Sequence, residues 1–325
     1  MCAQSSVLGT QHSLEVGMRF GVHGLNFGKV AGEIPLLLQV VKSADDLGLD
    51  SVWVGDHIVI PRQIASAYPY SPTGTPPFKP DEAALEPLTL LAYLAGCTAH
   101  VQLGISVLIV PHRNPLYAAK VISTLDVLSG GRVICGVGAG WMREEFEALG
   151  LNFERRGQET DEWIRIFKVC WQEDDPAYHG KLFTFDHIAF EPKPVQKPHP
   201  PIWVGGNSRR AMRRAVELGD AWHPGWSRPD QLAAQLRDLR AILEKAGRDP
   251  ASLDLTVLRP LQIFDQPTKE PRRPLIGNAE QVAEDIRAYA RVGVSHLVFG
   301  FRTTDGQEML QQVERFAAEV RPLLA

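Results

Sequence analysis

Short, continuously apolar runs recur along the chain, and a longer segment with helical periodicity separates each from the next. Runs such as 51–55 (SVWVG) and 296–301 (HLVFGF) are typical of strands that are buried on both faces, as parallel strands are. The pattern predicts strands at residues 19–24, 51–55, 101–110, 133–137, 202–204, 221–223, 253–264 and 296–301.

The segments between these runs place apolar residues three and four positions apart, as one buried face of a helix requires. Pro35, Asn114 with Pro115, and Asn278 with Gln281 three residues later are helix-start signals. Eight strand–helix units of this kind predict an α/β fold, a closed (β/α)8 TIM barrel. An open doubly wound sheet is the alternative, but it does not need eight repeats.

Two segments interrupt this rhythm. Residues 58–85 follow the second strand and contain six prolines, so we expect a long binding loop or lid. Residues 174–201 follow the fourth strand and its helices, and 178–190 within them alternates as a hairpin does. We therefore predict one barrel domain over 18–325 with insertions after strands two and four, the second at about 174–201. A flexible polar tail is expected at 1–17.

Composition narrows the functional class. The formal net charge is −4 and 44% of residues are hydrophobic, which is ordinary for a globular enzyme and gives no basic surface for nucleic acid or membranes. The four cysteines form no C-x-x-C pair, and no run is long enough to span a membrane. These features predict a cytoplasmic protein without a metal site.

In a barrel the active site lies at the carboxyl ends of the strands, so the residues there are the candidates. The fourth strand runs into RVICGVGAGWMREE at 132–145, where glycines lead from a strand to a helix start. Such a turn can bind an anion through backbone amides. The strand ends carry no H-E-x-x-H, no G-x-S-x-G and no lysine. Glycine turns with aromatic neighbours favour a planar cofactor that bears a phosphate.

The motifs VGDHIVIP, LGISVLIVPHRNP, GVGAGWMREEFEALG and PIWVGGNS make the chain resemble the bacterial luciferase-like superfamily. Within it, the chain is most similar to the branch of deazaflavin (coenzyme F420) dependent oxidoreductases. The resemblance covers nearly everything from Met18 onward.

The resemblance implies roles for particular residues. Asp56 and His57 stand where the superfamily has a polar pair that faces cofactor and substrate. Ser106–Val107 corresponds to a non-prolyl cis peptide that backs the cofactor ring. The glycine turns at 138–140 and 205–206 correspond to the loops that hold the cofactor's ribityl chain and phosphate. The full candidate set for cofactor binding is Ser106, Val107, Gly138, Ala139, Gly140, Trp141, Gly205, Gly206 and Asn207. Many deazaflavin enzymes have an acidic residue where this chain has Trp141, with Glu144 and Glu145 a turn later.

These implications predict an oxidoreductase that transfers hydride between bound coenzyme F420 and a small organic substrate, with His57 orienting or protonating the substrate. An FMN-dependent monooxygenase using oxygen is one alternative, and a non-catalytic flavin-binding protein is another. A homodimer is the expected assembly. Other interpretations stay open. Asp56 could cap the loop, and His112 and Arg113 could be structural residues. A cluster of arginines could bind an anion or form a solvated helix face (Arg209, Arg210, Arg213, Arg214).

Overall fold

The protein is described by a computed structural model at residues 17–71 and 73–325, so the expected tail lies outside the described residues apart from Gly17. Eight parallel strands close into a barrel, in which each strand pairs with the next and the last pairs with the first. They are β1 (Arg19–His23), β2 (Ser51–Val54), β3 (Gln102–Ile105), β5 (Val133–Gly138), β8 (Ile202–Gly205), β9 (Ala221–His223), β10 (Asp254–Ile263) and β12 (His296–Phe301). The predicted (β/α)8 barrel is confirmed.

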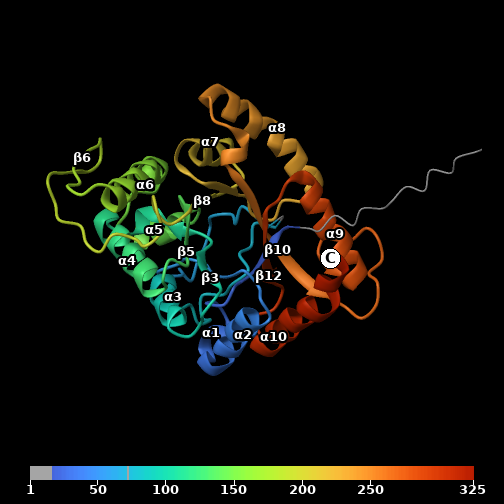
Figure 1. Cartoon of the computed structure of the whole chain (residues 1–325). Helices are drawn as coiled ribbons and strands as arrows, with labels where there is room; N and C mark the ends of the chain where they lie inside the picture. The colour runs from blue at the N-terminus through green and yellow to red at the C-terminus, as the bar shows by residue number, and fades with distance from the viewer. Residues whose placement is uncertain (1–16, 72) are drawn as a thin grey trace, which may run out of the picture.

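Helices surround the strands, as Figure 1 shows. They are α1 (Lys29–Gly32), α2 (Ile34–Asp46), α3 (Pro87–Ala95), α4 (Pro115–Leu128), α5 (Arg143–Ala148), α6 (Arg156–Gln172), α7 (Arg209–Leu218), α8 (Pro229–Ala246), α9 (Ala279–Val292) and α10 (Gly306–Arg315). The predicted start signals are confirmed: Asn114 accepts hydrogen bonds from Leu116 N and Tyr117 N, and Asn278 and Gln281 form a capping box. The short helix α1 was not predicted.

The barrel interior is filled by large aromatic side chains. Trp53 and Trp203 are buried in the interior of the barrel, with ring centroids 4.8 Å apart. The neighbouring strand must make room for the indole of Trp53, because a Cβ atom on Gly104 would lie 2.2 Å from it. The main hydrophobic core lies between the outer faces of the strands and the helices. The interior is therefore closed, and space for ligands remains at the strand ends.

Both predicted insertions are present. The first insertion, 58–85, crosses the carboxyl ends of the strands, and its described residues, 58–71 and 73–85, contain no helix. The second insertion contains an antiparallel hairpin of β6 (Tyr178–His179) and β7 (Thr184–Phe185).

The predicted third strand, 101–110, is shorter than expected. It divides into β3 and β4 (Leu108–Ile109), and Val110–His112 forms a 3-10 turn. Ser106 and Val107 lie at the break, and the peptide bond between them is cis, as predicted. The apolar pattern could not show this break, because the residues on both sides of it are buried.

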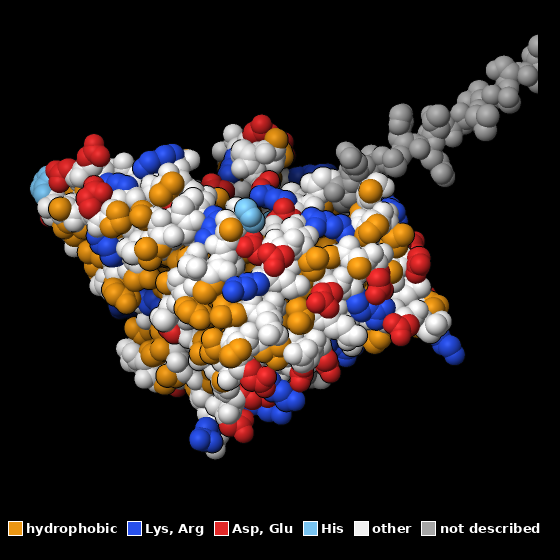
Figure 2. All heavy atoms as spheres, turned by 60° about the horizontal axis from the view of Figure 1, so that its bottom comes forward, with side chains coloured by type: hydrophobic (Ala, Val, Ile, Leu, Met, Phe, Trp, Pro, Cys, Tyr) orange, Lys and Arg blue, Asp and Glu red, His pale blue; other side chains and the backbone are white. Residues whose placement is uncertain are grey.

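Among residues 17–71 and 73–325, no helix is both long and apolar enough to cross a membrane. Figure 2 shows acidic and basic side chains interspersed over the face that is turned forward. On that face neither sign of charge dominates, in keeping with the small net charge.

Candidate active site

A cavity of about 540 Å³, here called the main cavity, opens at the carboxyl ends of the strands. All eleven predicted site residues line it: Asp56, His57, Ser106, Val107, Gly138, Ala139, Gly140, Trp141, Gly205, Gly206 and Asn207. The long loop contributes Tyr68, Pro69, Tyr70, Pro77 and Phe78. The volume lies in the usual range for sites that bind small molecules and cofactors. Residues up to 151 positions apart in the sequence therefore lie around one cavity, as expected for residues at strand ends.

Val107 projects between two glycines on the floor of this cavity. A Cβ on Gly138 would lie 2.4 Å from Val107 Cγ2, and a Cβ on Gly205 would lie 2.5 Å from Val107 Cγ1. Neither position can therefore carry a side chain while Val107 stays in place. Packing against Val107 thus accounts for glycine at these two positions, and the approach of a phosphate to the two turns stays a prediction.

Uncharged histidines support the floor from below. His223 Nε2 lies 2.9 Å from Ser106 Oγ, and His23 Nε2 lies 3.3 Å from Ser106 O. Burial lowers the pKa of His23 to about 4 and that of His223 to about 3. Both imidazoles are therefore neutral near pH 7, and they hold Ser106 by hydrogen bonds without adding charge.

His57 forms a close pair with Glu145, which α5 carries in its first turn. His57 Nδ1 lies 2.6 Å from Glu145 Oε2, while Glu145 Oε1 accepts hydrogen bonds from Ile58 N at 2.8 Å and Val59 N at 3.3 Å. Burial alone would raise the pKa of Glu145, but these contacts, the hydrogen bond from His57 foremost, hold it below its usual value. A carboxylate at Nδ1 fixes that nitrogen as the donor and leaves Nε2 for a ligand.

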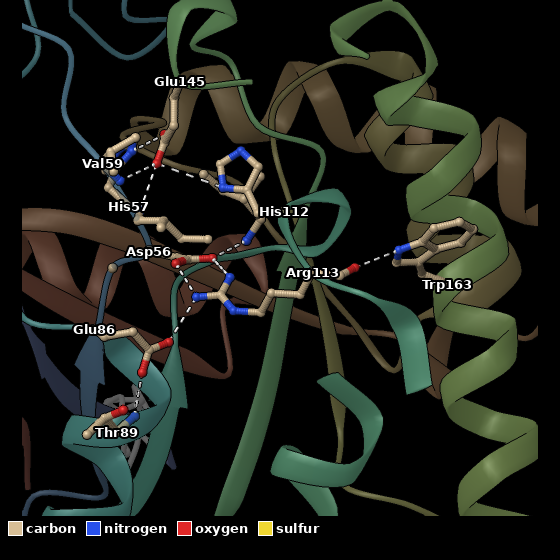
Figure 3. A network of polar contacts seen from close by, with 12 residues as sticks. Asp56, His57, Val59, Glu86, Thr89, His112, Arg113, Glu145 and Trp163 are labelled. Carbon is tan, nitrogen blue, oxygen red and sulfur yellow. Dashed lines mark hydrogen bonds and ion pairs between the residues drawn. The ribbon is translucent and has the colours of Figure 1, made fainter. Parts of the chain in front are cut away.

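Asp56, unlike His57, binds an arginine, as Figure 3 shows. Its carboxylate accepts two hydrogen bonds from the Arg113 guanidinium, at 2.7 and 2.9 Å, and one from Ile109 N at 2.7 Å. Arg113 also donates to Glu86 Oε1 at 2.9 Å, and the other oxygen of Glu86 caps α3. The Asp56 side chain is fully buried. Three hydrogen bonds hold the carboxylate in place, which favours a positioning role, and the catalytic role of Asp56 stays a prediction.

Trp141 and Asn207 also lie where predicted. The Trp141 ring contacts Tyr68 and His57 edge to face, with centroids 5.2 and 6.2 Å apart, so it forms a wall beneath the loop. The Asn207 side chain donates to Gly225 O at 2.8 Å and accepts from Gly225 N at 2.9 Å. Its amide holds the neighbouring turn and has little capacity left for a cofactor.

The far end of the cavity is cationic. Arg156 and Arg210 line it beside Ser208, which caps the start of α7. The Arg156 guanidinium stacks on the Phe153 ring at 3.7 Å and donates only to carbonyl oxygens, those of Gly140 and Phe153. Glu154 also lines this end, but its ion pair is with Arg143, and neither Arg156 nor Arg210 forms an ion pair among the described residues. A helix start beside such arginines is a suitable site for a phosphate.

Sequence reasoning missed Glu145 as the partner of His57 and Arg113 as the partner of Asp56. Both pairs join residues far apart in the chain, and periodicity carries no information about such contacts. The available signal was the position of Glu145 in the first turn after the strand-four glycines. The described residues contain no cluster of three or more His, Cys, Asp or Glu suited to a metal ion.

Comparisons with known proteins agree with this geometry. An uncharacterised protein of Mycobacterium tuberculosis is 30% identical over 223 residues, 69% of this chain and 76% of that protein. A phthiodiolone/phenolphthiodiolone dimycocerosates ketoreductase of the same species is 30% identical over 250 residues, 75% of this chain and 65% of that protein. An FMNH2-dependent dimethylsulfone monooxygenase of Pseudomonas putida is 36% identical over 131 residues, 39% of this chain and 36% of that protein.

Solved structures share the fold at low sequence identity. The monooxygenase RslO1 of Streptomyces bottropensis matches with a TM-score of 0.76 and 20% identity, covering 95% of this chain and 100% of that one. An F420-dependent secondary alcohol dehydrogenase matches with a TM-score of 0.74 and 18% identity, covering 95% and 99%. The sequence model described as luciferase-like monooxygenase matches residues 18–270. The chain therefore belongs to the luciferase-like monooxygenase family, whose members are oxidoreductases.

Proposed function

We propose that the protein is an F420-dependent oxidoreductase that transfers hydride between the deazaflavin and a small organic substrate. The observation that carries this proposal is the His57–Glu145 pair on the wall of the main cavity. A hydride that adds to a carbonyl carbon, or leaves an alcohol carbon, requires a proton to be delivered to, or taken from, the oxygen. An imidazole held by a buried carboxylate is suited to both directions.

The residues present fit a planar cofactor that bears a phosphate. Val107, bracketed by two glycines, gives the floor an apolar surface against which a ring system can lie. Arg156, Arg210 and the start of α7 would hold the phosphate. When bound, the cofactor ring would supply the hydride chemistry, and the protein would supply binding, orientation and proton transfer.

His57 would act through Nε2. Because Glu145 accepts from Nδ1, the ring is held in one orientation, and Phe78 and Phe27 pack against it with centroids 4.8 and 6.0 Å away. These two rings give the imidazole apolar neighbours at the wall of the cavity. Glu145 stabilises the charged imidazole when His57 gains a proton.

Both glutamates of α5 also hold the loop over the cavity. Glu144 Oε1 accepts hydrogen bonds from Ala65 N at 2.9 Å and Ser66 N at 3.0 Å, and Glu145 binds Ile58 N and Val59 N. The buried carboxylate of Glu145 and the half-buried carboxylate of Glu144 therefore hold the first part of the loop, residues 58–66. We infer that closure over the substrate is set by α5, the helix that also orients His57.

A second candidate is an FMN-dependent monooxygenase. The name of the family and the similarity to the dimethylsulfone monooxygenase favour it. In contrast, the ketoreductase covers more of the chain, and its name denotes reduction of a carbonyl. A phosphate site and an apolar floor serve either cofactor, so the choice of F420 rests on the motif resemblance and on the proton-transfer pair.

Direct titration tests the proposal. Purified protein freed of cofactor is titrated with F420 and, separately, with FMN, and the fluorescence of each ligand is followed. We expect F420 to bind and its reduced form to be oxidised by a carbonyl substrate without oxygen. Tight binding of FMN with no binding of F420, together with oxygen consumption, would establish the monooxygenase instead. Turnover with either cofactor excludes a binding protein without catalysis.

A further inference from the structure

A second cavity, of about 300 Å³, adjoins the main cavity on the side of β10 and β12 and is here called the arginine pocket. Five residues line both cavities: His23, Phe27, Tyr68, Pro77 and Phe78. The remaining lining includes Arg259, Arg273 and Arg302 and contains no Asp or Glu. The pocket is therefore cationic, although the whole chain has a formal net charge of −4.

Arg259 is the innermost of these charges. It lies within β10 and is only 5% exposed. Its Nη1 group donates to the carbonyl oxygen of Trp226, and its Nε–H is buried with no hydrogen-bond partner among the described residues. Burial lowers the pKa of this guanidinium, but it remains charged, since arginine is not deprotonated in proteins.

The groups around Arg259 do not neutralise it. Asp285 is the nearest acidic influence, but it accepts hydrogen bonds from Arg272 and from Leu275 N. Tyr289 donates its hydroxyl hydrogen to Ser227 O at 3.0 Å. Arg228 and Arg273 add further positive charge nearby. A buried cation with no counter-ion is costly, so a fold gains nothing by keeping it unless an anion binds there.

Apart from the three arginines, His23, Thr303 and Thr304, most of the pocket lining is apolar. Its walls include Leu258, Ile276, Phe301 and Met309, with the shared aromatic rings at the boundary to the main cavity. Liquid water occupies about 30 Å³ per molecule, so the volume suits a ligand on the order of ten non-hydrogen atoms. Arg273 and Arg302 are exposed and flank the entrance. The pocket therefore has positive charge at one end and apolar walls between that end and His57. A ligand complementary to it is an amphipathic anion.

We propose that the arginine pocket is the substrate subsite, and that the substrate is a small carboxylate with an apolar body whose head group binds Arg259. The reacting carbon would then lie at the boundary formed by Phe27 and Phe78, which is also where both rings contact His57. This inference rests on the proposed function for the identity of the reacting molecule. The binding of the carboxylate itself does not depend on which cofactor the main cavity holds.

The test compares carboxylates with neutral molecules of the same shape. Hexanoate and benzoate are titrated calorimetrically into the full-length protein without cofactor, alongside hexanamide and benzamide. We expect the carboxylates to bind at least tenfold more tightly than the amides, because hydrogen bonds to charged groups are the stronger ones. Equal binding of acid and amide would overturn the proposal.

Variants assign the preference to Arg259. Arg259→Met keeps the length and apolar stem of the side chain and is expected to weaken carboxylate binding roughly ten- to a hundredfold. Arg259→Lys, which keeps the charge but loses the planar fork, should fall between the two. Arg237→Met, on the exposed side of α8 and outside both cavities, is the matched control and should bind as the wild type does.

Two further readouts separate this role from other roles of Arg259. Thermal unfolding of Arg259→Met without ligand should occur at the wild-type temperature or above it, whereas a clear fall would show that Arg259 serves the fold. F420 carries an acidic tail, so its affinity is measured in the same variant. A loss of F420 affinity with carboxylate binding unchanged would assign the pocket to the cofactor and overturn the substrate assignment. If F420 does not bind at all but the carboxylate preference persists, the proposed cofactor is wrong and the subsite remains.

Discussion

Arg113 beside the main cavity and Arg259 in the arginine pocket both carry a largely buried guanidinium group. The side chain of Arg113 is 7% exposed, and Arg259 as a whole residue is 5% exposed. Arg113 contacts two carboxylates, those of Asp56 and Glu86. Arg259 contacts a carbonyl oxygen and no acidic group among the described residues. The different partners of these two guanidinium groups indicate different uses: Arg113 completes the structure around His57, and Arg259 is left for a ligand.

Among the variants, His57→Asn is expected to have the largest effect on turnover. It tests whether a residue that faces the ligand, such as His57, has a different role from a residue that supports the structure, such as Arg113. Loss of the imidazole should reduce turnover about 10²- to 10⁴-fold, the usual contribution of a general acid or base, and leave cofactor affinity nearly unchanged. Steady-state kinetics and cofactor titration measure the two effects. His100→Asn, at an exposed position, is the control. Near-full turnover in His57→Asn would contradict the proton-transfer role.

Arg113→Met tests the other side of the comparison. It leaves the Asp56 carboxylate buried without its cation, and breaking a buried pair in this way typically costs about 3–5 kcal/mol of stability. Urea unfolding should show this loss, which Arg259→Met should not show. Combining Arg113→Met with Asp56→Asn removes both charges and should recover part of the stability. A loss below about 1 kcal/mol would mean that the network does not hold the fold at this point.

Arg156 resembles Arg259 more than Arg113, because it is half-buried and donates only to carbonyl oxygens. By the reasoning applied to Arg259, it should be reserved for an anion, here the cofactor phosphate. Arg156→Met should weaken cofactor binding about tenfold with a small change in stability. Fluorescence titration measures the affinity, and Arg155→Met, the exposed neighbour, is the control. Unchanged affinity in Arg156→Met would place the phosphate elsewhere.

The last prediction concerns the neutral histidines beneath Ser106, whose effect is spread over several pH units. Their folded-state pKa values, about 4 for His23 and about 3 for His223, lie below the ordinary value of 6.5. Between these values the unfolded chain binds more protons than the folded protein. The free energy of unfolding should therefore fall as pH decreases from about 6.5, by up to about 1.4 kcal/mol per pH unit for each imidazole.

Urea unfolding between pH 7.5 and 5.5 checks this slope, because most carboxylates titrate below that window. Burial also lowers the pKa values of His112 and His296, so these two histidines add to the same slope. His223→Asn removes one of the two groups and should flatten the dependence. An identical slope in the variant would show that His223 is not the source.

Much of the fold could be predicted, because buried parallel strands and amphipathic helices leave a strong periodic signal. The strand ends then identified a set of residues that line one cavity. What the pattern could not show was which polar side chains are already satisfied. Asp56 and His57 are neighbours in the chain, yet the Asp56 carboxylate accepts two hydrogen bonds from Arg113, while the His57 ring keeps Nε2 without a partner among the described residues.

Arg259 illustrates the same limit. Within the apolar run 253–264 it is one polar residue in a strand, and nothing local distinguishes a residue that faces solvent from one that faces a buried pocket. That distinction depends on β12 and on the loop over the barrel, which come together only in the closed fold. The homodimer stays a prediction, because a single chain does not test it.

The contacts of Val107 with Gly138 and Gly205 have a consequence for how this protein can evolve. Removing the two methyl groups of Val107 would leave its Cβ 3.4 Å from a new Cβ at position 138 and 3.5 Å from one at 205, which are ordinary contacts. Alanine at either glycine position is therefore harmful beside valine and tolerable beside Val107→Ala. The three positions are epistatic, so a lineage can gain a side chain in either turn only after it has shortened the one at 107.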